Sequence, residues 1–215
     1  MLKERDSYGR FTCLKPNLAP TVQLAYLLGA IMGDGYTHFW NKGNGDNAAI
    51  VLRVKSLRFS KKFANYMQMI GLRPKLFREK DYTKAGRKSF FTVLTYSKEF
   101  VMWYKQLTLN KVRNFLLDIN LKKAFIEGFW DAEGNWHKPK KKKKCIMIQI
   151  GNSNLKLLGF IQQILLELGY RTSKYIKSPN KWHKRIFGSL FLKGGYGVSL
   201  KFLKDFGEKE TLRRK

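Results

Sequence analysis

Two acidic residues end two similar apolar segments of the sequence, and their placement suits metal chemistry. Asp34 ends LAYLLGAIMGD, and Glu133 ends KAFIEGFWDAE. If each segment is a helix, its acid lies at the C-terminal end, where the helix dipole already places partial negative charge and cations are preferred. Two carboxylates at such ends favour a bound cation, and Mg²⁺ fits because it takes few protein ligands and keeps water or phosphate oxygens.

The surroundings of the two acids form an internal repeat. Adding 99 to the positions of the first small residues gives small residues again, as in Ala25 and Ala124, Gly29 and Gly128, and Gly33 and Ala132. Downstream, IVLRVKS is similar to IMIQIGN, and FSKKFANYMQMIGLRP is parallel to LKLLGFIQQILLELGYRT. Three matches in the same order predict two copies of one unit, joined near residues 105–115.

Periodicity predicts the same elements in each copy, in the order α-β-β-α-β-β-α. The expected helices are 21–33, 58–70, 98–107, 120–132, 154–168 and 198–206. The first hairpin has strands near 35–41 and 48–56, and its counterpart spans about 134–151. The prediction is an α+β fold with two mainly antiparallel sheets. We divide it into an N-terminal extension (1–18), a first unit (19–107) and a second unit (108–215).

The small residues recur every fourth position, so they form a stripe along each acid-ended helix. Such stripes allow two helix backbones to approach closely. We therefore expect the two helices to pack side by side, which would bring Asp34 and Glu133 together. The alternative is a pair of ordinary buried helices whose glycines are C-terminal caps.

Composition points to a polyanionic partner. The 215 residues include 43 Lys and Arg against 15 acids, a formal charge of +28 that disfavours a compact state unless it is neutralised. Nucleic acid is the leading partner, and an anionic membrane surface is the alternative.

The sequence has no signal-peptide pattern or membrane-spanning run, so we expect a cytoplasmic protein without a membrane partner. Cys13 and Cys145 lack metal-ligand spacing and are expected to be free thiols.

AYLLGAIMGDG and AFIEGFWDAEG resemble the two LAGLIDADG motifs of homing endonucleases in their single-chain form, most closely the intron-encoded enzymes of archaea. The resemblance covers about residues 20–206. It implies a saddle in which the motif helices form the interface between two pseudo-symmetric units and both sheets enter the DNA major groove. It also implies a monomer that cuts both strands of a long specific DNA site, with Mg²⁺ or Mn²⁺, and leaves short 3′ overhangs.

The same resemblance assigns roles at the motif ends. Asp34 and Glu133 match the metal-binding acids, and the backbone carbonyls of Gly33 and Ala132 would add ligands. Asp131 matches an acidic position that is usually structural. A residue on the early strands often orders the attacking water. Lys55 fits that role in the first copy or contacts only the DNA backbone, whereas the second copy has Trp136 at the expected place, with Gln149 the closest polar candidate.

DNA contacts are expected from polar, basic and aromatic residues that alternate along the strands. The candidates are Tyr36, His38, Trp40, Arg53, Lys55, Arg78, Lys80, Tyr82, Trp136, Lys138, Lys140, Gln149, Lys174, Lys177, Trp182, Arg185 and Lys193. The lysine run 140–144 and the basic, aromatic segment 182–185 are expected to contact phosphates rather than bases.

Two other functions remain open for a chain of this composition. One is an intron RNA maturase or a DNA-binding regulator on the same scaffold. Such proteins often lose one acid, and this chain has both. The other is a ribosomal or structural RNA-binding protein, which would account for the charge but not for the duplicated acid-ended helices.

Overall fold

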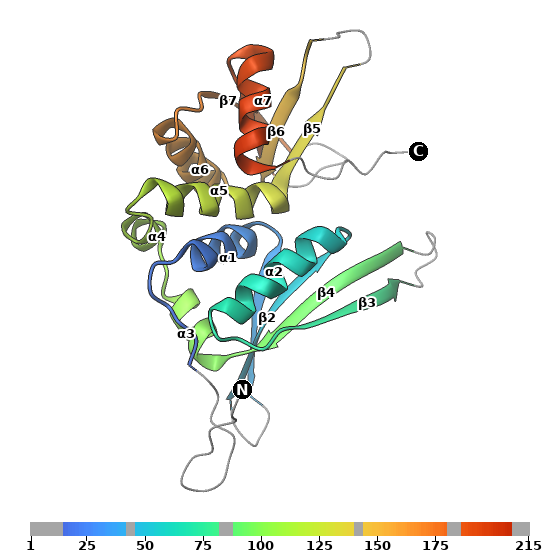
Figure 1. Cartoon of the computed structure of the whole chain (residues 1–215), viewed down its shortest axis with the longest axis vertical. Coiled ribbons are helices and arrows are strands. Elements are labelled where there is room, and N and C mark those ends of the chain that lie inside the picture. Colours follow the sequence, from blue (N-terminus) through green and yellow to red (C-terminus); the bar gives the residue numbers. More distant parts are fainter. Residues whose placement is uncertain (1–14, 42–45, 82–87, 140–143, 180–185, 208–215) are drawn as a thin grey trace, which may run out of the picture.

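The chain folds into two units with the same order of elements, as expected (Figure 1). The computed structural model describes residues 15–41, 46–81, 88–139, 144–179 and 186–207. The first unit comprises α1 (Val22–Gly33), β1 (Gly35–Asn41), β2 (Asp46–Val54), α2 (Leu57–Met69), β3 (Lys75–Asp81), β4 (Lys88–Tyr96) and α3 (Lys98–Lys105). The second comprises α5 (Ile119–Glu133), β5 (Gly134–His137), β6 (Met147–Asn152), α6 (Leu155–Glu167), β7 (Thr172–Lys177), β8 (Phe187–Leu192) and α7 (Gly195–Phe206). A short helix that the sequence did not predict, α4 (Leu109–Phe115), connects them.

Local sequence signals begin and end the helices at matching places in the two units. Ser56 and Asn154 cap α2 and α6, and each side chain accepts a hydrogen bond from a backbone N–H of the first turn. Gly71 and Gly169 follow these helices with φ of +90° and +84°. That left-handed conformation costs glycine little, so these glycines end the helices and turn the chain toward β3 and β7.

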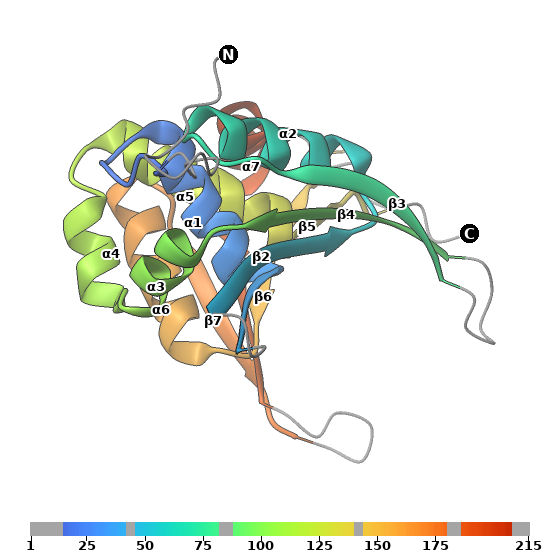
Figure 2. The same ribbon diagram turned by 90° about the horizontal axis from the view of Figure 1, so that it is seen from below.

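Each unit contains one four-stranded antiparallel sheet, with strand orders β1-β2-β4-β3 and β5-β6-β8-β7. The register begins equivalently, with Gly35 opposite Leu52 and Gly134 opposite Ile150. Helices cover one face of each sheet, and the sheets curve away from the helices like the two sides of an arch (Figure 2). We call the face turned away from the helices the outer face. The α+β class with two antiparallel sheets is thus confirmed.

The two motif helices, α1 and α5, pack along each other at the centre of the molecule (Figure 1). A Cβ atom at Gly29 would lie 2.0 Å from the carbonyl oxygen of Phe125, and one at Gly128 would lie 2.0 Å from that of Tyr26. The repeat offset of 99 converts Tyr26 to Phe125 and Gly29 to Gly128, so the two contacts are equivalent under the repeat. The stripe of small residues therefore permits backbone-to-backbone packing, and the side-by-side arrangement is confirmed.

Two further expectations concern the chain as a whole. No helix in the described part of the chain is long and apolar enough to cross a membrane. Cys145 is a free thiol, and Cys13 lies outside the described residues.

Candidate catalytic junction and nucleic-acid interface

The C-terminal ends of α1 and α5 touch. A Cβ atom at Gly33 would lie 2.4 Å from Cβ of Ala132 and 3.1 Å from Cγ of Glu133. Asp34 follows Gly33 directly as the C-cap of α1, and Glu133 is the last residue of α5. Asp34 is exposed and Glu133 is half-buried. The two motif ends thus form one junction at the base of both sheets, with both acids in it.

No loop separates each acid from the strand that follows it. β1 begins at Gly35 and β5 begins at Gly134. A side chain at either glycine would collide, because its Cβ would lie 2.7 Å from Cα of Ile31 or 1.9 Å from the ring of Trp130. The glycine of each motif is therefore required by this tight passage from helix to strand.

Asn152, at the end of β6, holds the second acid. Its Nδ2 donates to Oε1 of Glu133 at 2.6 Å, while its Oδ1 accepts from the backbone N–H of Asn154 at 2.7 Å. The asparagine is only 8% exposed, so both its ends are fixed. The caps Asn154 and Ser56 are 98 positions apart, and by the same offset Asn152 corresponds to Val54 in the first unit. Sequence reasoning missed Asn152 because the repeat offers no polar counterpart; an asparagine ending an apolar strand was the available signal.

Lys55 directly follows Val54, the last residue of β2, and its side chain is exposed. Its Nζ is 6.0 Å from the centre of the Phe90 ring. Arg53 lies over the same ring at 4.4 Å and pairs with Glu79 at 2.8 Å. Lys55 is thus an exposed cation two residues from an arginine whose charge is already paired.

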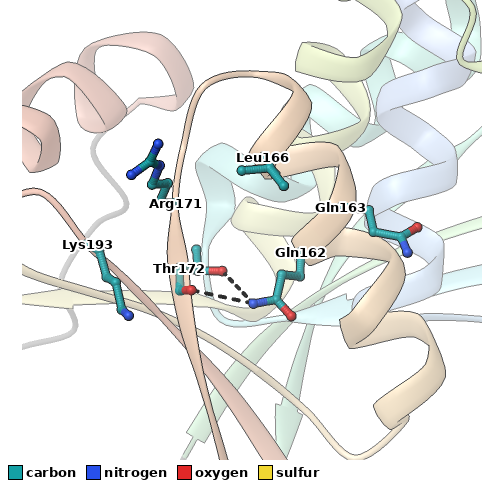
Figure 3. A pocket seen from close by; sticks show the side chains of 6 residues that line it. All are labelled: Gln162, Gln163, Leu166, Arg171, Thr172 and Lys193. Atoms are coloured by element: carbon teal, nitrogen blue, oxygen red, sulfur yellow. Dashed lines mark hydrogen bonds between the residues drawn. The ribbon is translucent and has the colours of Figure 1, made fainter.

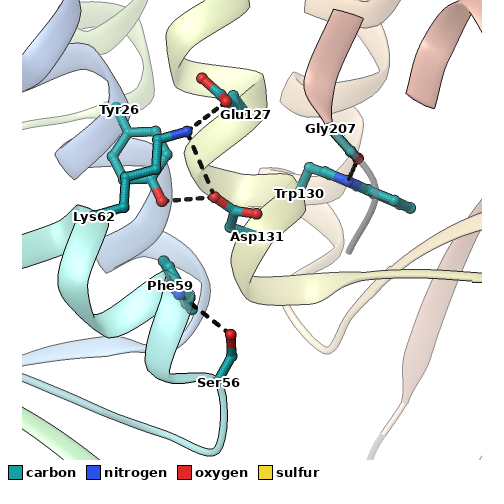
Figure 4. A network of polar contacts seen from close by, with 8 residues as sticks. All are labelled: Tyr26, Ser56, Phe59, Lys62, Glu127, Trp130, Asp131 and Gly207. Atoms are coloured by element: carbon teal, nitrogen blue, oxygen red, sulfur yellow. Dashed lines mark hydrogen bonds and ion pairs between the residues drawn. The ribbon is translucent and has the colours of Figure 1, made fainter. Parts of the chain in front are cut away.

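Asp131 belongs to a network that joins the two units (Figure 4). Its Oδ2 accepts a hydrogen bond from the Tyr26 hydroxyl at 2.7 Å, and Nζ of Lys62 lies 3.9 Å away. Lys62 also pairs with Glu127 and lies 4.5 Å above the Tyr26 ring. Burial raises the pKa of Tyr26, and the neighbouring Asp131 charge raises it further, so the hydroxyl keeps its proton and remains a donor. These contacts give Asp131 a structural role.

The register of the first sheet divides the predicted DNA contacts between its two faces, because directly opposed residues share a face. Tyr36, His38 and Trp40 are opposite Val51, Ala49 and Asn47, on the outer face. Arg53, opposite Thr92, lies on that face too.

The predicted alternation along β3 is shifted by one residue. Arg78 is opposite Phe91 and donates to Oγ of Ser89 at 2.8 Å, on the helix side of the sheet. Lys80 occupies the same phase of the strand. Phe77 and Glu79 are the β3 residues on the outer face. Arg78 therefore does not share a face with Tyr36 and Arg53. The hydrophobic alternation along β3 is too weak for the sequence to predict the phase of this strand.

The second sheet corrects another expectation. Trp136 is opposite Ile148, on the helix side, and it packs against the core. Gln149 lies on the outer face, where its Nε2 donates to Oγ of Ser189 at 2.9 Å. An aromatic residue beside polar neighbours suggested a DNA contact for Trp136, but tertiary packing uses the ring to cover the core. Lys138 follows β5 and is exposed.

The lysines of the β7–β8 region are also divided. Lys177 is opposite Phe187 on the outer face, whereas Lys174 is opposite Leu190 on the helix side. Lys193 lines a pocket beside α6 together with Arg171 and Gln162, whose amide donates to Oγ1 of Thr172 at 3.2 Å (Figure 3).

The remaining candidates, Tyr82, Lys140, Trp182 and Arg185, lie outside the described residues, as do the other members of 140–143 and 182–185.

Known proteins share this motif and this fold. Residues 120–193 match a LAGLIDADG-like domain. A solved structure of a mesophilic variant of the homing endonuclease I-DmoI is 26% identical, with a TM-score of 0.62 over 86% of this chain and 94% of that chain. The chain belongs to the LAGLIDADG family. It is a two-motif member, with one motif helix in each pseudo-symmetric unit.

Three other matches differ in what is known of them. Two uncharacterized proteins of Methanocaldococcus jannaschii, MJ0314 and MJ0398, are 31% and 25% identical over 78% and 81% of this chain. The chain spans 62% and 59% of their lengths, so they are longer proteins. The N-terminal LAGLIDADG domain of WhiA shares the fold at 16% identity, with a TM-score of 0.57 over 94% of this chain and 96% of that domain. The LAGLIDADG fold is thus the fold of DNA endonucleases, and it also occurs in WhiA.

Proposed function

We propose that the chain is a site-specific double-strand DNA endonuclease of the intron-homing type. The observation that supports this most directly is the contact between the ends of α1 and α5, which brings the acid-ended motifs to one junction. One acid for each DNA strand would account for a repeat that carries both acids to the same place. In an arrangement of this kind, the duplex runs along the outer faces of the two sheets and cleavage leaves short 3′ overhangs.

The donors at the junction fit a divalent cation. Carboxylate and carbonyl oxygens are the ligands that Mg²⁺ and Mn²⁺ prefer. Within the described ranges, no group of three or more His, Cys, Asp or Glu lies together, so the ion would keep water or phosphate oxygens as further ligands. Asp34 and Glu133, with the carbonyls of Gly33 and Ala132, would hold it. When bound, such an ion activates water and neutralises charge on the phosphate.

The other residues of the junction would orient the reacting groups. Asn152 fixes one oxygen of Glu133, so the carboxylate has one preferred direction. Lys55 would bring an exposed positive charge to the phosphate of the strand nearest the first unit. Tyr36, His38, Trp40, Gln149 and Lys177 would contact the duplex from the outer faces, while Arg78, Lys80, Trp136, Lys174 and Lys193 are no longer proposed as base contacts. A solved I-DmoI complex with DNA and Ca, 26% identical with a TM-score of 0.62 over 86% of this chain and 88% of that one, supports DNA and a divalent ion as partners.

Cleavage of a duplex library in Mg²⁺ or Mn²⁺ tests the proposal. The parent chain should cut both strands of one long site, and Asp34→Asn and Glu133→Gln should each abolish cutting while binding survives. Glu99→Gln, which removes an exposed acid in the first turn of α3, is the matched control and should cut normally. Sedimentation on one DNA site should give one chain for each duplex; an obligate dimer would contradict the proposed monomer.

A non-cleaving DNA-binding protein or an RNA maturase is the second candidate. The LAGLIDADG fold also occurs in WhiA, at 16% identity, so the fold by itself does not select cleavage over binding. The presence of both acids favours cutting. Tight binding of selected duplexes without cleavage in either metal would reverse that preference.

A further inference from the structure

Three aromatic rings lie together on the outer face of the first sheet. The rings of His38 and Trp40 are 5.1 Å apart, and those of Trp40 and Tyr96 are 6.1 Å apart in an edge-to-face contact. We call His38, Trp40 and Tyr96 the aromatic cluster. Ala49 is paired with His38 on one side and Tyr96 on the other, and it is only 2% exposed although it lies on the outer face. Side chains on this face therefore cover it.

The aromatic cluster remains accessible to a partner. Tyr96 is 59% exposed and His38 is exposed, whereas Trp40 is half-buried between them. The second sheet does not repeat the arrangement. There His137 is paired with Met147 where His38 is paired with Ala49, and β5 ends at His137, before the position that corresponds to Trp40. The cluster is thus a feature of one half of the molecule.

The surroundings of the aromatic cluster favour apolar contacts over ionic ones. Val51, two residues along β2 on the same face, is apolar and 8% exposed. Arg53, two residues further on, is already paired with Glu79. A duplex on this face would therefore meet the aromatic rings, because Ala49 and Val51 lie buried beneath the surface and the charge of Arg53 is paired.

In the major groove, the apolar group that distinguishes one base from the others is the C5-methyl of thymine. We propose that the aromatic cluster reads thymine methyl groups in the half of the target bound by the first unit. The proposal rests on the proposed function, because it assumes that the outer faces contact duplex DNA. It adds a base preference that belongs to one half-site only.

The length of β1 sets where these thymines should lie. Trp40 follows Gly35 by five residues, which is about 17 Å at roughly 3.4 Å per residue. Base pairs rise by about 3.4 Å. With β1 lying along the groove, the aromatic cluster falls about five base pairs from the centre between the two acids.

The test begins with binding rather than cleavage. Duplexes that bind the full chain are selected from a randomised double-stranded DNA library in Ca²⁺. Each thymine of the preferred duplex is then replaced singly by deoxyuridine, which removes only the methyl group. We expect Kd to rise about fourfold for a methyl lost about five base pairs from the centre of one half, the factor for one buried CH₂-sized group. Replacements in the other half at the same distance should leave Kd unchanged.

Variants connect the effect to the aromatic cluster. Trp40→Ala and Tyr96→Ala should weaken binding to the thymine duplex and abolish the difference between thymine and deoxyuridine. Trp40→Phe keeps a ring and should retain part of the difference, which separates a lost contact from a misfolded sheet. Met69→Ala removes an exposed apolar side chain on α2, and this control should bind and discriminate like the parent.

The possible outcomes distinguish the inference from the proposed function. Equal Kd for thymine and deoxyuridine throughout the first half-site would overturn the inference and leave the endonuclease proposal standing; the rings would then only stabilise the sheet. A difference that persists in Trp40→Ala and Tyr96→Ala would also overturn it. A selection that returns no preferred duplex would contradict the proposed function and the inference together.

Discussion

The two sides of the α1–α5 interface have the same backbone arrangement and different chemistry. On one side, Lys62 and Tyr26 of the first unit contact Glu127 and Asp131 of the second. Shifting these positions by the repeat offsets of 98 and 99 gives the other side, where the residues are Phe160, Phe125, Leu28 and Met32. There Phe125 and Phe160 meet edge to face, with ring centres 5.9 Å apart. A polar network thus faces an apolar contact across the pseudo-two-fold axis.

The difference shows what the repeat conserves in this molecule and what it leaves open. The reciprocal contacts of Gly29 and Gly128 require a small residue on both sides, because backbone meets backbone at each. The flanking side chains fill space between helices, and either an ion pair or two aromatic rings can fill it. The junction follows the same rule: a glycine begins each of the two strands, whereas Asn152, which holds Glu133, corresponds to Val54 in the first unit. Both halves lie in one chain, so each side of the interface can have its own residues.

The largest expected effect concerns the symmetric part of the interface. Gly29→Ala and Gly128→Ala should each destabilise the fold by about 3 kcal/mol, because each added methyl would collide with a carbonyl oxygen of the facing helix. Urea unfolding of both variants measures the loss. Gly159→Ala on α6 is the control: nothing lies within 4 Å of its Cβ position, and alanine is favoured over glycine in a helix by about 1 kcal/mol. Tolerance of one interface substitution and not the other would break the symmetry.

Lys62→Met tests the polar side. The substitution leaves Glu127 and Asp131 without their cation. We expect the free energy of unfolding, measured in urea, to fall by about 2 kcal/mol. The loss is smaller than for a fully buried pair because these side chains are 21–30% exposed.

Making the two sides alike sharpens the same test. The combined variant Tyr26→Phe, Lys62→Phe, Glu127→Leu and Asp131→Met copies the apolar side. Its free energy of unfolding should lie within about 1 kcal/mol of the parent's, because apolar residues can replace an ion-pair network at little cost. If the combined variant loses more free energy of unfolding than Lys62→Met alone, the polar network does more than fill the space between the helices.

Asn152 tests the difference between the two acids. Asn152→Asp keeps the acceptor for Asn154 but replaces the donor to Glu133 with a second carboxylate. One strand should then be cut about tenfold more slowly, the equivalent of about 1.4 kcal/mol, and a nicked duplex should accumulate. Strand-specific labelling follows both cuts. Equal slowing of the two strands would mean that Asn152 supports the junction as a whole rather than Glu133.

Tyr26→Phe should have the smallest effect, about 1 kcal/mol at neutral pH, because Lys62 still faces Asp131 after the hydroxyl is lost. Burial raises the pKa of Tyr26 in the folded chain, while an unfolded tyrosine ionises near pH 10. The stability that Tyr26 contributes is therefore complete below about pH 10 and is lost as pH rises above it. Unfolding of parent and variant between pH 8 and 11 should show their difference shrinking; a constant difference would contradict the raised pKa.

Much of the fold could be predicted from the sequence, because the signals were duplicated. The motif helices, the order of helices and strands along the chain and the contact of the two small-residue stripes all follow from patterns that occur twice. Asn152 and the helix α4 occur once, so the repeat gave no indication of them. The phase of β3 and the inward position of Trp136 depend on which face of each strand the helices cover. That choice is made by tertiary packing, which spacing along the chain does not encode.

The absence of a linker between each acid and its strand has a mechanical consequence. Asp34 and Glu133 are one peptide bond from the first residues of β1 and β5, and the glycines there pack against the preceding helix. A strand that shifts to fit an imperfect duplex must pull its carboxylate along by a similar distance. In the proposed endonuclease, the fit between the sheets and the duplex would thereby be transmitted to the carboxylates, so that a wrong sequence would lower turnover as well as affinity.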